Sequence, residues 1–328
     1  MLTIFRTNQL MAGILLAFYI LLVRGSVFFV PVELEPEGIG PLAAWLYAWI
    51  GSSGQTPAIV AMALLLLQSF YLNYLVMEHR LATEVSLFPG LFYILMASYL
   101  PAFQYLSPVL IGNTFFLIVI GEVFATYRKT RAADRIFNIG FWSGVGALFY
   151  PAFLLLILVG FTGLNIFRAF KIRERLMVLV GVFVPYFLLG VYAFWEGGYA
   201  EFQEQVLSGL EWLSFVPVEA ARVYRGLGIM SLFILVVLFS HRSYMLKQNI
   251  QVQRKLNLIF WGLLIFTVSL LFQAQIQLDH LLVTAVPIGL LLSINFVRMP
   301  KRMAEVLHLL LLVITLALQL QPMVFPGY

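Results

Sequence analysis

Cysteine is absent from the 328 residues, and recognisable site motifs are absent as well. The lack of cysteine excludes disulfide bonds, thiolate metal sites and cysteine nucleophiles. No Walker-type phosphate loop, GxGxxG turn or HExxH zinc motif occurs in the sequence. The four histidines are too scattered to give metal-ligand spacing, so we predict no metal site from them; they are His79, His241, His280 and His308.

Charged residues are also scarce, at 11% of the chain, whereas hydrophobic residues make up 62%. A soluble domain carries about 25% charged residues. This chain cannot cover a water-facing surface, so we predict an all-α polytopic membrane protein, with residues 1–328 forming a single integral membrane domain. We expect about 11 membrane segments, two of them short. They are Leu10–Val30, Thr56–Met77, Ser86–Tyr105, Ser107–Tyr127, Phe137–Tyr150, Pro151–Gly163, Leu176–Trp195, Gly226–Ser240, Leu256–Phe272, Leu281–Val297 and Ala304–Leu320.

Two further helices are expected to lie along the outer face of the membrane as amphipathic interfacial helices. Pro41–Ile50 is too short to span, since about 20 residues are needed, and its tryptophan and tyrosine side chains favour the headgroup level. Within Glu196–Arg225 the apolar residues recur at helical spacing, which is typical of a helix lying on a membrane surface. These apolar residues are Phe202, Val206, Leu210 and Leu213.

Lysine and arginine are distributed unevenly along the chain. All but three of the 20 lie in segments that we assign to one side, and the exceptions are Arg24, Arg222 and Arg225. Short loops rich in these residues stay in the cytoplasm. We therefore predict a multi-pass protein of the bacterial inner membrane with its N-terminus in the cytoplasm and its C-terminus outside. The net charge of +5 reports this topology and does not indicate nucleic-acid binding.

The apolar run Phe137–Gly163 has two interpretations. As one helix it would place the basic cluster that follows on the outer side, against the positive-inside pattern. As two legs that meet at Tyr150 and Pro151, each leg would have about 14 residues, or about 21 Å of helix, and both basic clusters would stay in the cytoplasm. We prefer the two legs, packed inside the bundle through glycine residues.

Polar residues without a topological role gather on the outer side. Arg24 lies late in the first segment, where it either extends to the outer interface or faces an anion in an outer cavity. Arg222 and Arg225 are three residues apart, so on a helix they share a face and could hold a diphosphate. The alternative is that they pair with Glu219 or with lipid phosphates.

Four other polar residues carry separate expectations. Asp279 and His280 stand together at a helix end, where they form either a proton-transfer pair that contacts substrate or a marker of the membrane interface. Glu122 is close enough in sequence to Arg128 to form an ion pair. We expect His308 to be packed and hydrogen-bonded within the last segment.

The segment Ser107–Gly163 consists of a helix, a basic linker and a glycine-rich helix that ends in an aromatic-proline pair. This order resembles the middle of the C-type polytopic glycosyltransferases and the related O-antigen polymerases. In those families the first outer loop carries acidic catalytic residues and is followed by an interfacial helix. The resemblance implies catalytic roles for Glu33, Glu35 and Glu37, although those families usually have Asp or an Asp-Glu pair there. The whole chain also resembles an uncharacterised family of inner-membrane proteins of Bacteroidota.

Two functions of different classes follow from these observations. The first is transfer or polymerisation of a glycan carried by a polyprenyl phosphate at the outer face of the inner membrane. A glutamate of the first outer loop would act as general base or metal ligand, and Arg222 and Arg225 would hold the carrier phosphates. The second is a non-catalytic subunit or scaffold of a cell-envelope assembly. A transporter is disfavoured, because intramembrane charge pairs and inverted repeats are lacking. Membrane lipids are the expected partners, with a polyprenyl-phosphate-linked glycan in the first case; the sequence identifies no cofactor and no protein partner.

Overall fold

The structure is a computed structural model that describes residues 2–6, 9–29, 39–52, 54–208, 221–245, 248–270 and 277–324. Every regular element in these ranges is helical, as the sequence predicts. Seven helical segments are long and apolar enough to cross a membrane, and shorter apolar helices accompany them. The chain is therefore a multi-pass helical membrane protein, while the count of eleven segments stays a prediction.

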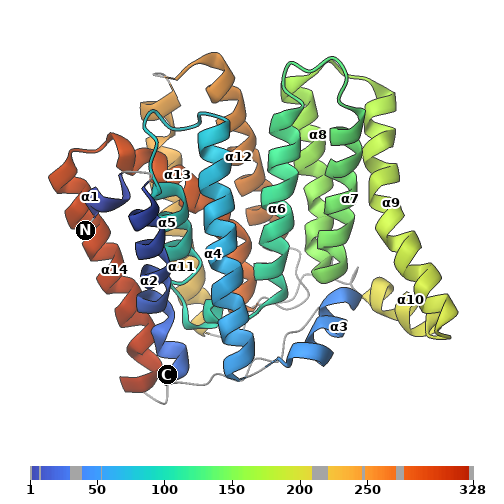
Figure 1. Ribbon diagram of the computed structural model, residues 1–328, viewed down its shortest axis with the longest axis horizontal. Helices are drawn as coiled ribbons and strands as arrows, with labels where there is room; N and C mark the ends of the chain where they lie inside the picture. The colour runs from blue at the N-terminus through green and yellow to red at the C-terminus, as the bar shows by residue number, and fades with distance from the viewer. Residues whose placement is uncertain are drawn as a thin grey trace.

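The helices run side by side, with α2 and α14 at one edge of the view and α9 at the other (Figure 1). In chain order they are α1 Leu2–Phe5, α2 Leu10–Arg24, η1 Gly25–Phe28, α3 Pro41–Ile50, α4 Gln55–Glu78, α5 Phe88–Met96, η2 Pro101–Gln104, α6 Pro108–Ala125, α7 Ala133–Phe149, η3 Pro151–Leu155, α8 Leu156–Phe167, α9 Ile172–Trp195, α10 Tyr199–Ser208, α11 Ala221–Met245, α12 Ile250–Ser269, η6 Leu278–Thr284, α13 Ala285–Arg298 and α14 Lys301–Val324.

The centre of the bundle is formed by α5 and α13, whose residues are buried almost without exception. A Cβ atom on Gly289 would lie 2.7 Å from the Tyr93 Cα atom, so the two backbones touch at this glycine. The segment Ser86–Tyr105, expected to be kinked near Pro89 and Pro101, is interrupted before Pro101, while its crossing of the membrane stays a prediction. The α-helix has nine residues and ends at Met96, and Pro101 starts a separate 3-10 turn, η2.

The run Phe137–Gly163 forms two legs, as predicted. Helix α7 ends at Phe149, and Pro151 opens η3, which leads into α8. The Arg168 guanidinium after α8 donates hydrogen bonds to the Thr126 carbonyl, at 3.3 Å, and to the Lys129 carbonyl. The two basic loops therefore lie against each other at the same end of the molecule, which we call the basic end.

Glycine residues allow α7 and α9 to pack backbone against backbone. A Cβ atom on Gly140 would overlap the Val178 carbonyl, and one on Gly181 would overlap the Phe137 carbonyl. Lipid tails are as apolar as the helix surfaces, so the hydrophobic effect does not drive helices together within a membrane. Helices instead gain van der Waals contacts by approaching closely at small residues. This contact holds α9 at the edge of the bundle, where most of its remaining surface is exposed.

Helices α3 and α10 lie together at the end away from the basic loops (Figure 1), which we call the far end. The Gly40 amide donates a 3.0 Å hydrogen bond to the Phe149 carbonyl, which docks the start of α3 on the end of α7. Both helices have ten residues. Both were expected as interfacial helices; their position relative to a membrane stays a prediction.

Candidate functional site

Buried polar side chains from four parts of the chain meet around η6 at the far end. Tyr47 comes from α3, Asn113 from α6, Tyr150 from the turn after α7, and Asp279 and His280 from η6 itself. We call these five residues the η6 cluster. The sequence prediction contained Asp279 and His280, and the structure adds the other three.

The local geometry of η6 determines which His280 nitrogen carries the proton. The Gln277 backbone N–H donates to His280 Nδ1 at 3.3 Å, so the neutral ring carries its own proton on Nε2. That Nε2 atom lies 4.0 Å from Asp279 Oδ1, and the imidazole packs against Tyr150 with ring centroids 5.4 Å apart. The cluster therefore holds an acid and an imidazole side by side, with the imidazole N–H on the side of the acid.

Two acceptor atoms of the cluster lack donors. Asp279 is 3% exposed, and its Oδ1 atom has no hydrogen-bond partner among the described residues. Asn113 donates to the Leu282 carbonyl at 3.0 Å, while its own Oδ1 atom is likewise unpartnered in the described chain. An unsatisfied buried acceptor costs about 1–3 kcal/mol, and such groups are few in native proteins. These two oxygens are suited to a ligand that brings hydroxyl or amine donors.

Tyr47 closes the cluster from the side of α3. Its hydroxyl donates a 2.6 Å hydrogen bond to the Leu106 carbonyl, just before α6. Burial raises the pKa of the Tyr47 hydroxyl, and the nearby Asp279 carboxylate raises this pKa further. The hydroxyl therefore stays protonated at neutral pH, and Tyr47 lies close enough to the acid of η6 to be affected by its charge.

Arg24 does not extend to the interface, and that interpretation of the sequence is wrong. The residue is 0% exposed. Its Nη2 atom donates to the carbonyls of Ala97 and Phe103, both at 2.7 Å, and its Nε atom donates to Ser98 Oγ at 3.0 Å. The guanidinium thus joins the end of α5 to η2, which in turn packs against η6. These contacts give Arg24 a positioning role; its predicted contact with substrate stays untested.

Helix α11 brings Arg225 to the same region. A Cβ atom on Gly226 would lie 2.8 Å from the Leu278 Cδ2 atom, so this turn of α11 packs directly on η6. The Arg225 side chain is exposed and does not turn inward toward Arg24. The Arg222 backbone belongs to the same helix, but its side chain lies outside the described part of the structure.

Glu33, Glu35 and Glu37 also lie outside the described residues, as does Glu219. The predicted ion pair of Glu122 with Arg128 is wrong. Glu122 pairs with Arg135 at 3.1 Å, because Arg128 adopts a left-handed backbone, φ 57°, and places its guanidinium over the Tyr127 ring.

His308 is packed and hydrogen-bonded, as predicted, with its Nε2 atom 3.0 Å from the Tyr19 hydroxyl. The described residues contain no group of three or more histidine or acidic side chains able to hold a metal ion.

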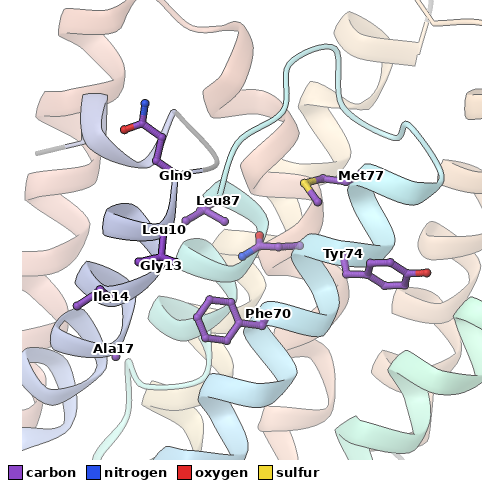
Figure 2. Close-up of a pocket in the computed structure, with 10 residues that line it drawn as sticks. Gln9, Leu10, Gly13, Ile14, Ala17, Phe70, Tyr74, Met77 and Leu87 are labelled. Atoms are coloured by element: carbon purple, nitrogen blue, oxygen red, sulfur yellow. The ribbon is translucent and has the colours of Figure 1, made fainter.

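A groove of about 550 Å³ between α2 and α4 lies away from this cluster (Figure 2). Its walls are mostly apolar, and its lining includes Gly13 and Ile14 of α2 and Phe70 and Tyr74 of α4. In Figure 2 the Phe70 ring points from α4 toward α2. Asn73 also lines it, and the Asn73 side chain accepts a 2.8 Å hydrogen bond from the Gly90 amide of α5. The lining offers neither an acid nor a base, so this groove carries no candidate chemistry.

A second groove, of about 460 Å³, opens between α11 and α12. Its lining is largely aliphatic and aromatic, with His241, Asn257 and Thr267 as polar members. Both helices that form it also pack against η6. The groove is therefore a lateral apolar surface whose two walls extend to the η6 cluster.

Comparison with known proteins gives a fold but no family. No family model and no curated protein matches the sequence. The structure is similar to the crystal structure of ArnT from Cupriavidus metallidurans bound to undecaprenyl phosphate, with a TM-score of 0.55 and 14% sequence identity. The match covers 88% of this chain and 59% of ArnT, so this chain spans well under two thirds of that protein's length. The comparison thereby shows a fold similar to that of ArnT. Neither the resemblance to the C-type glycosyltransferases nor that to a Bacteroidota family gains a family assignment.

Proposed function

We propose that this protein is an enzyme that transfers a glycan from a polyprenyl phosphate carrier at its far end, which we place outside the cytoplasm. The observation that carries the proposal is the Asp279 carboxylate, buried beside His280 with its Oδ1 atom unpartnered among the described residues. A sugar presents several hydroxyl donors that would satisfy this oxygen. The two unpartnered acceptors of the η6 cluster therefore favour a glycan as the ligand.

Two observations support a lipid-linked substrate. The ArnT structure with a similar fold is described as bound to undecaprenyl phosphate. In this chain, the groove between α11 and α12 offers an apolar lateral surface on two helices that also pack against η6, and this surface is suited to an isoprenoid tail. We assign the phosphate to Arg222 and Arg225, at the start of α11 next to η6, since guanidinium groups bind phosphate oxygens in pairs.

The reaction needs a base for the acceptor. The acceptor hydroxyl oxygen bonds to the anomeric carbon of the donor sugar, the bond from that carbon to the phosphate oxygen breaks, and polyprenyl phosphate leaves with the electron pair. A glutamate among Glu33, Glu35 and Glu37 takes the hydroxyl proton as general base. If the site binds a metal ion, these carboxylates would be the residues to hold it, and the ion would make the acceptor hydroxyl more acidic. The chain reaches α3 immediately after these acids, and α3 carries Tyr47 to the η6 cluster. Asp279 orients the sugar through its free oxygen.

The test combines binding and transfer. Purified protein in lipid nanodiscs is titrated with undecaprenyl phosphate, and lipid-linked glycans are profiled in a deletion strain that carries each variant. We expect Asp279→Asn to lower transfer by about 10²-fold or more with little change in lipid binding, and Arg222→Ala with Arg225→Ala to weaken lipid binding. Arg254→Ala, an exposed change on α12, is the matched control.

Normal lipid binding and normal glycan in stably folded Asp279→Asn and double-arginine variants would refute the proposal. If the deletion strain then still showed an altered envelope, the non-catalytic scaffold would be the better description.

A further inference from the structure

A groove at the far end, separate from the η6 cluster, lies among α3, α9 and α10. It has a volume of about 650 Å³, within the range of about 300–1,000 Å³ usual for small-ligand sites. Leu42, Trp45, Leu189 and Phe202 supply much of its apolar wall, and Glu201 is its charged member. We call it the α3–α10 groove.

The walls of this groove are held in place by specific contacts. After α9 the chain turns at Gly197, whose φ of 78° suits glycine, and α10 folds back along α9. Phe202 of α10 packs over Gly190 of α9, where an added Cβ atom would lie 3.3 Å from the ring. On the other side, the Gly40 amide fixes the start of α3 on the Phe149 carbonyl. The groove is therefore built by the fold of all three helices.

Its charge favours a cation. Glu201 is exposed, and in the described part of the chain it has neither an ion pair nor a hydrogen-bond partner. Neither Arg24 nor Arg225, the far-end bases whose side chains the structure describes, lines the groove. Arg24 is fully buried, and α11, which carries Arg222 and Arg225, packs mainly against α13 and η6. A headgroup with a net negative charge would find no described base in this groove, whereas an ammonium group would meet the Glu201 carboxylate, which has no ion-pair partner among the described residues.

The aromatic lining supports the same choice. Trp45 is 62% exposed and Tyr192 is 59% exposed, and both line the groove beside Glu201. Ammonium groups are attracted to tryptophan and tyrosine faces, and these residues are enriched at the headgroup level of membranes. Aliphatic and aromatic walls next to one carboxylate match a ligand with a cationic head and an apolar body.

We propose that the α3–α10 groove binds a bilayer phospholipid whose headgroup carries a primary ammonium, of the phosphatidylethanolamine type. The ammonium lies at Glu201 and against the ring of Trp45 or Tyr192, and an acyl chain lies along Leu42 and Leu189. This lipid is a bound membrane component and not the glycan carrier, so the proposal stands independently of the proposed function. It gives α3 and α10 a shared role in anchoring the far end to the headgroup layer.

The experiment is native mass spectrometry of the full chain in detergent micelles that contain equal amounts of dioleoyl-phosphatidylethanolamine and dioleoyl-phosphatidylglycerol. We expect the ethanolamine lipid to be retained preferentially. Glu201→Gln should lower this retention up to about fivefold, as expected for one accessible ion pair. Trp45→Leu should lower it as well. Glu204→Gln is the matched control, because Glu204 is also exposed on α10 but does not line the groove.

Three outcomes would overturn the proposal. The first is equal retention of the two lipids, which would mean that the groove binds acyl chains without selectivity for the headgroup. The second is an equal effect of Glu201→Gln and Glu204→Gln. The third is a protein that retains neither lipid, or a dimeric mass in which a second chain covers the groove. Circular dichroism of each variant checks that the helices are intact, and undecaprenyl phosphate binding, measured in parallel, separates this result from that of the proposed function.

Discussion

Replacing Arg24 by alanine should destabilise the protein strongly, and the structure gives the size of the effect. The guanidinium is 0% exposed and holds the carbonyls of Ala97 and Phe103, each at 2.7 Å from Nη2. Arg24→Ala leaves both carbonyls without this donor, at a cost of about 1–3 kcal/mol for each. With the loss of the Ser98 contact as well, we expect the free energy of unfolding to fall by about 3–5 kcal/mol. The folding equilibrium constant would change more than about 100-fold.

The assay is equilibrium unfolding by sodium dodecyl sulfate in mixed micelles, followed by far-ultraviolet circular dichroism. Arg225→Ala is the control, since this arginine is exposed on α11 and should leave the transition unchanged. Arg24→Lys should recover part of the loss, because an ammonium group has three donors but lacks the planar fork of arginine. An Arg24→Ala protein as stable as Arg225→Ala would refute the reasoning. If it also failed to bind undecaprenyl phosphate, Arg24 would be a ligand-binding residue, as the sequence first suggested.

Three further predictions address packing, pH and topology. Gly140→Ala should lower the free energy of unfolding by about 1–3 kcal/mol, because the added methyl group overpacks against α9. Gly228→Ala is the control, because a methyl group there enters open space on α11 and should not lower the free energy of unfolding. Thermal unfolding of the two variants measures the difference. Burial, and secondly the charge of Lys255, lowers the pKa of His79 to about 4 from the usual 6.5. Between those pH values the unfolded chain binds a proton at His79 that the folded chain excludes, so stability should decrease as the pH falls from about 6.5 to about 4, and His79→Gln should reduce this dependence. A reporter enzyme fused after Arg175 should report the cytoplasm, and an outside signal there would contradict the proposed orientation.

Hydropathy and the positions of basic residues were sufficient to predict a multi-pass helical protein and the break at Tyr150 and Pro151. Both signals are local. A segment is apolar because it faces lipid or other helices, and a loop is basic because of the side on which it lies. The paired basic loops, joined in the structure by Arg168, follow from these two signals alone. No knowledge of tertiary contacts was needed.

The buried polar contacts could not be predicted in this way. Arg24 binds carbonyls more than 70 positions later in the chain, and Asn113 binds the Leu282 carbonyl 169 positions away. These acceptors are backbone carbonyls, which every residue has, so the amino-acid sequence does not indicate which of them accepts the hydrogen bond. Glu122 shows the same limit at short range, since a single left-handed residue, Arg128, redirects its ion pair to Arg135. Asp279 and His280 were recognised because their own side chains carry the chemistry.

The irregular backbone near η6 connects Arg24 to the candidate site. Helix α5 ends after nine residues inside a buried environment, and η2 and η6 follow as 3-10 turns. Within an apolar bundle such turns leave carbonyls that need donors, and they are tolerated where protein surrounds them or where they line a cavity. Arg24 supplies donors for the carbonyls between α5 and η2, and η2 packs against η6, which carries Asp279. A membrane protein that needed only to span the bilayer would gain nothing from this arrangement, so the interrupted helices and the buried arginine favour the η6 cluster as the functional centre.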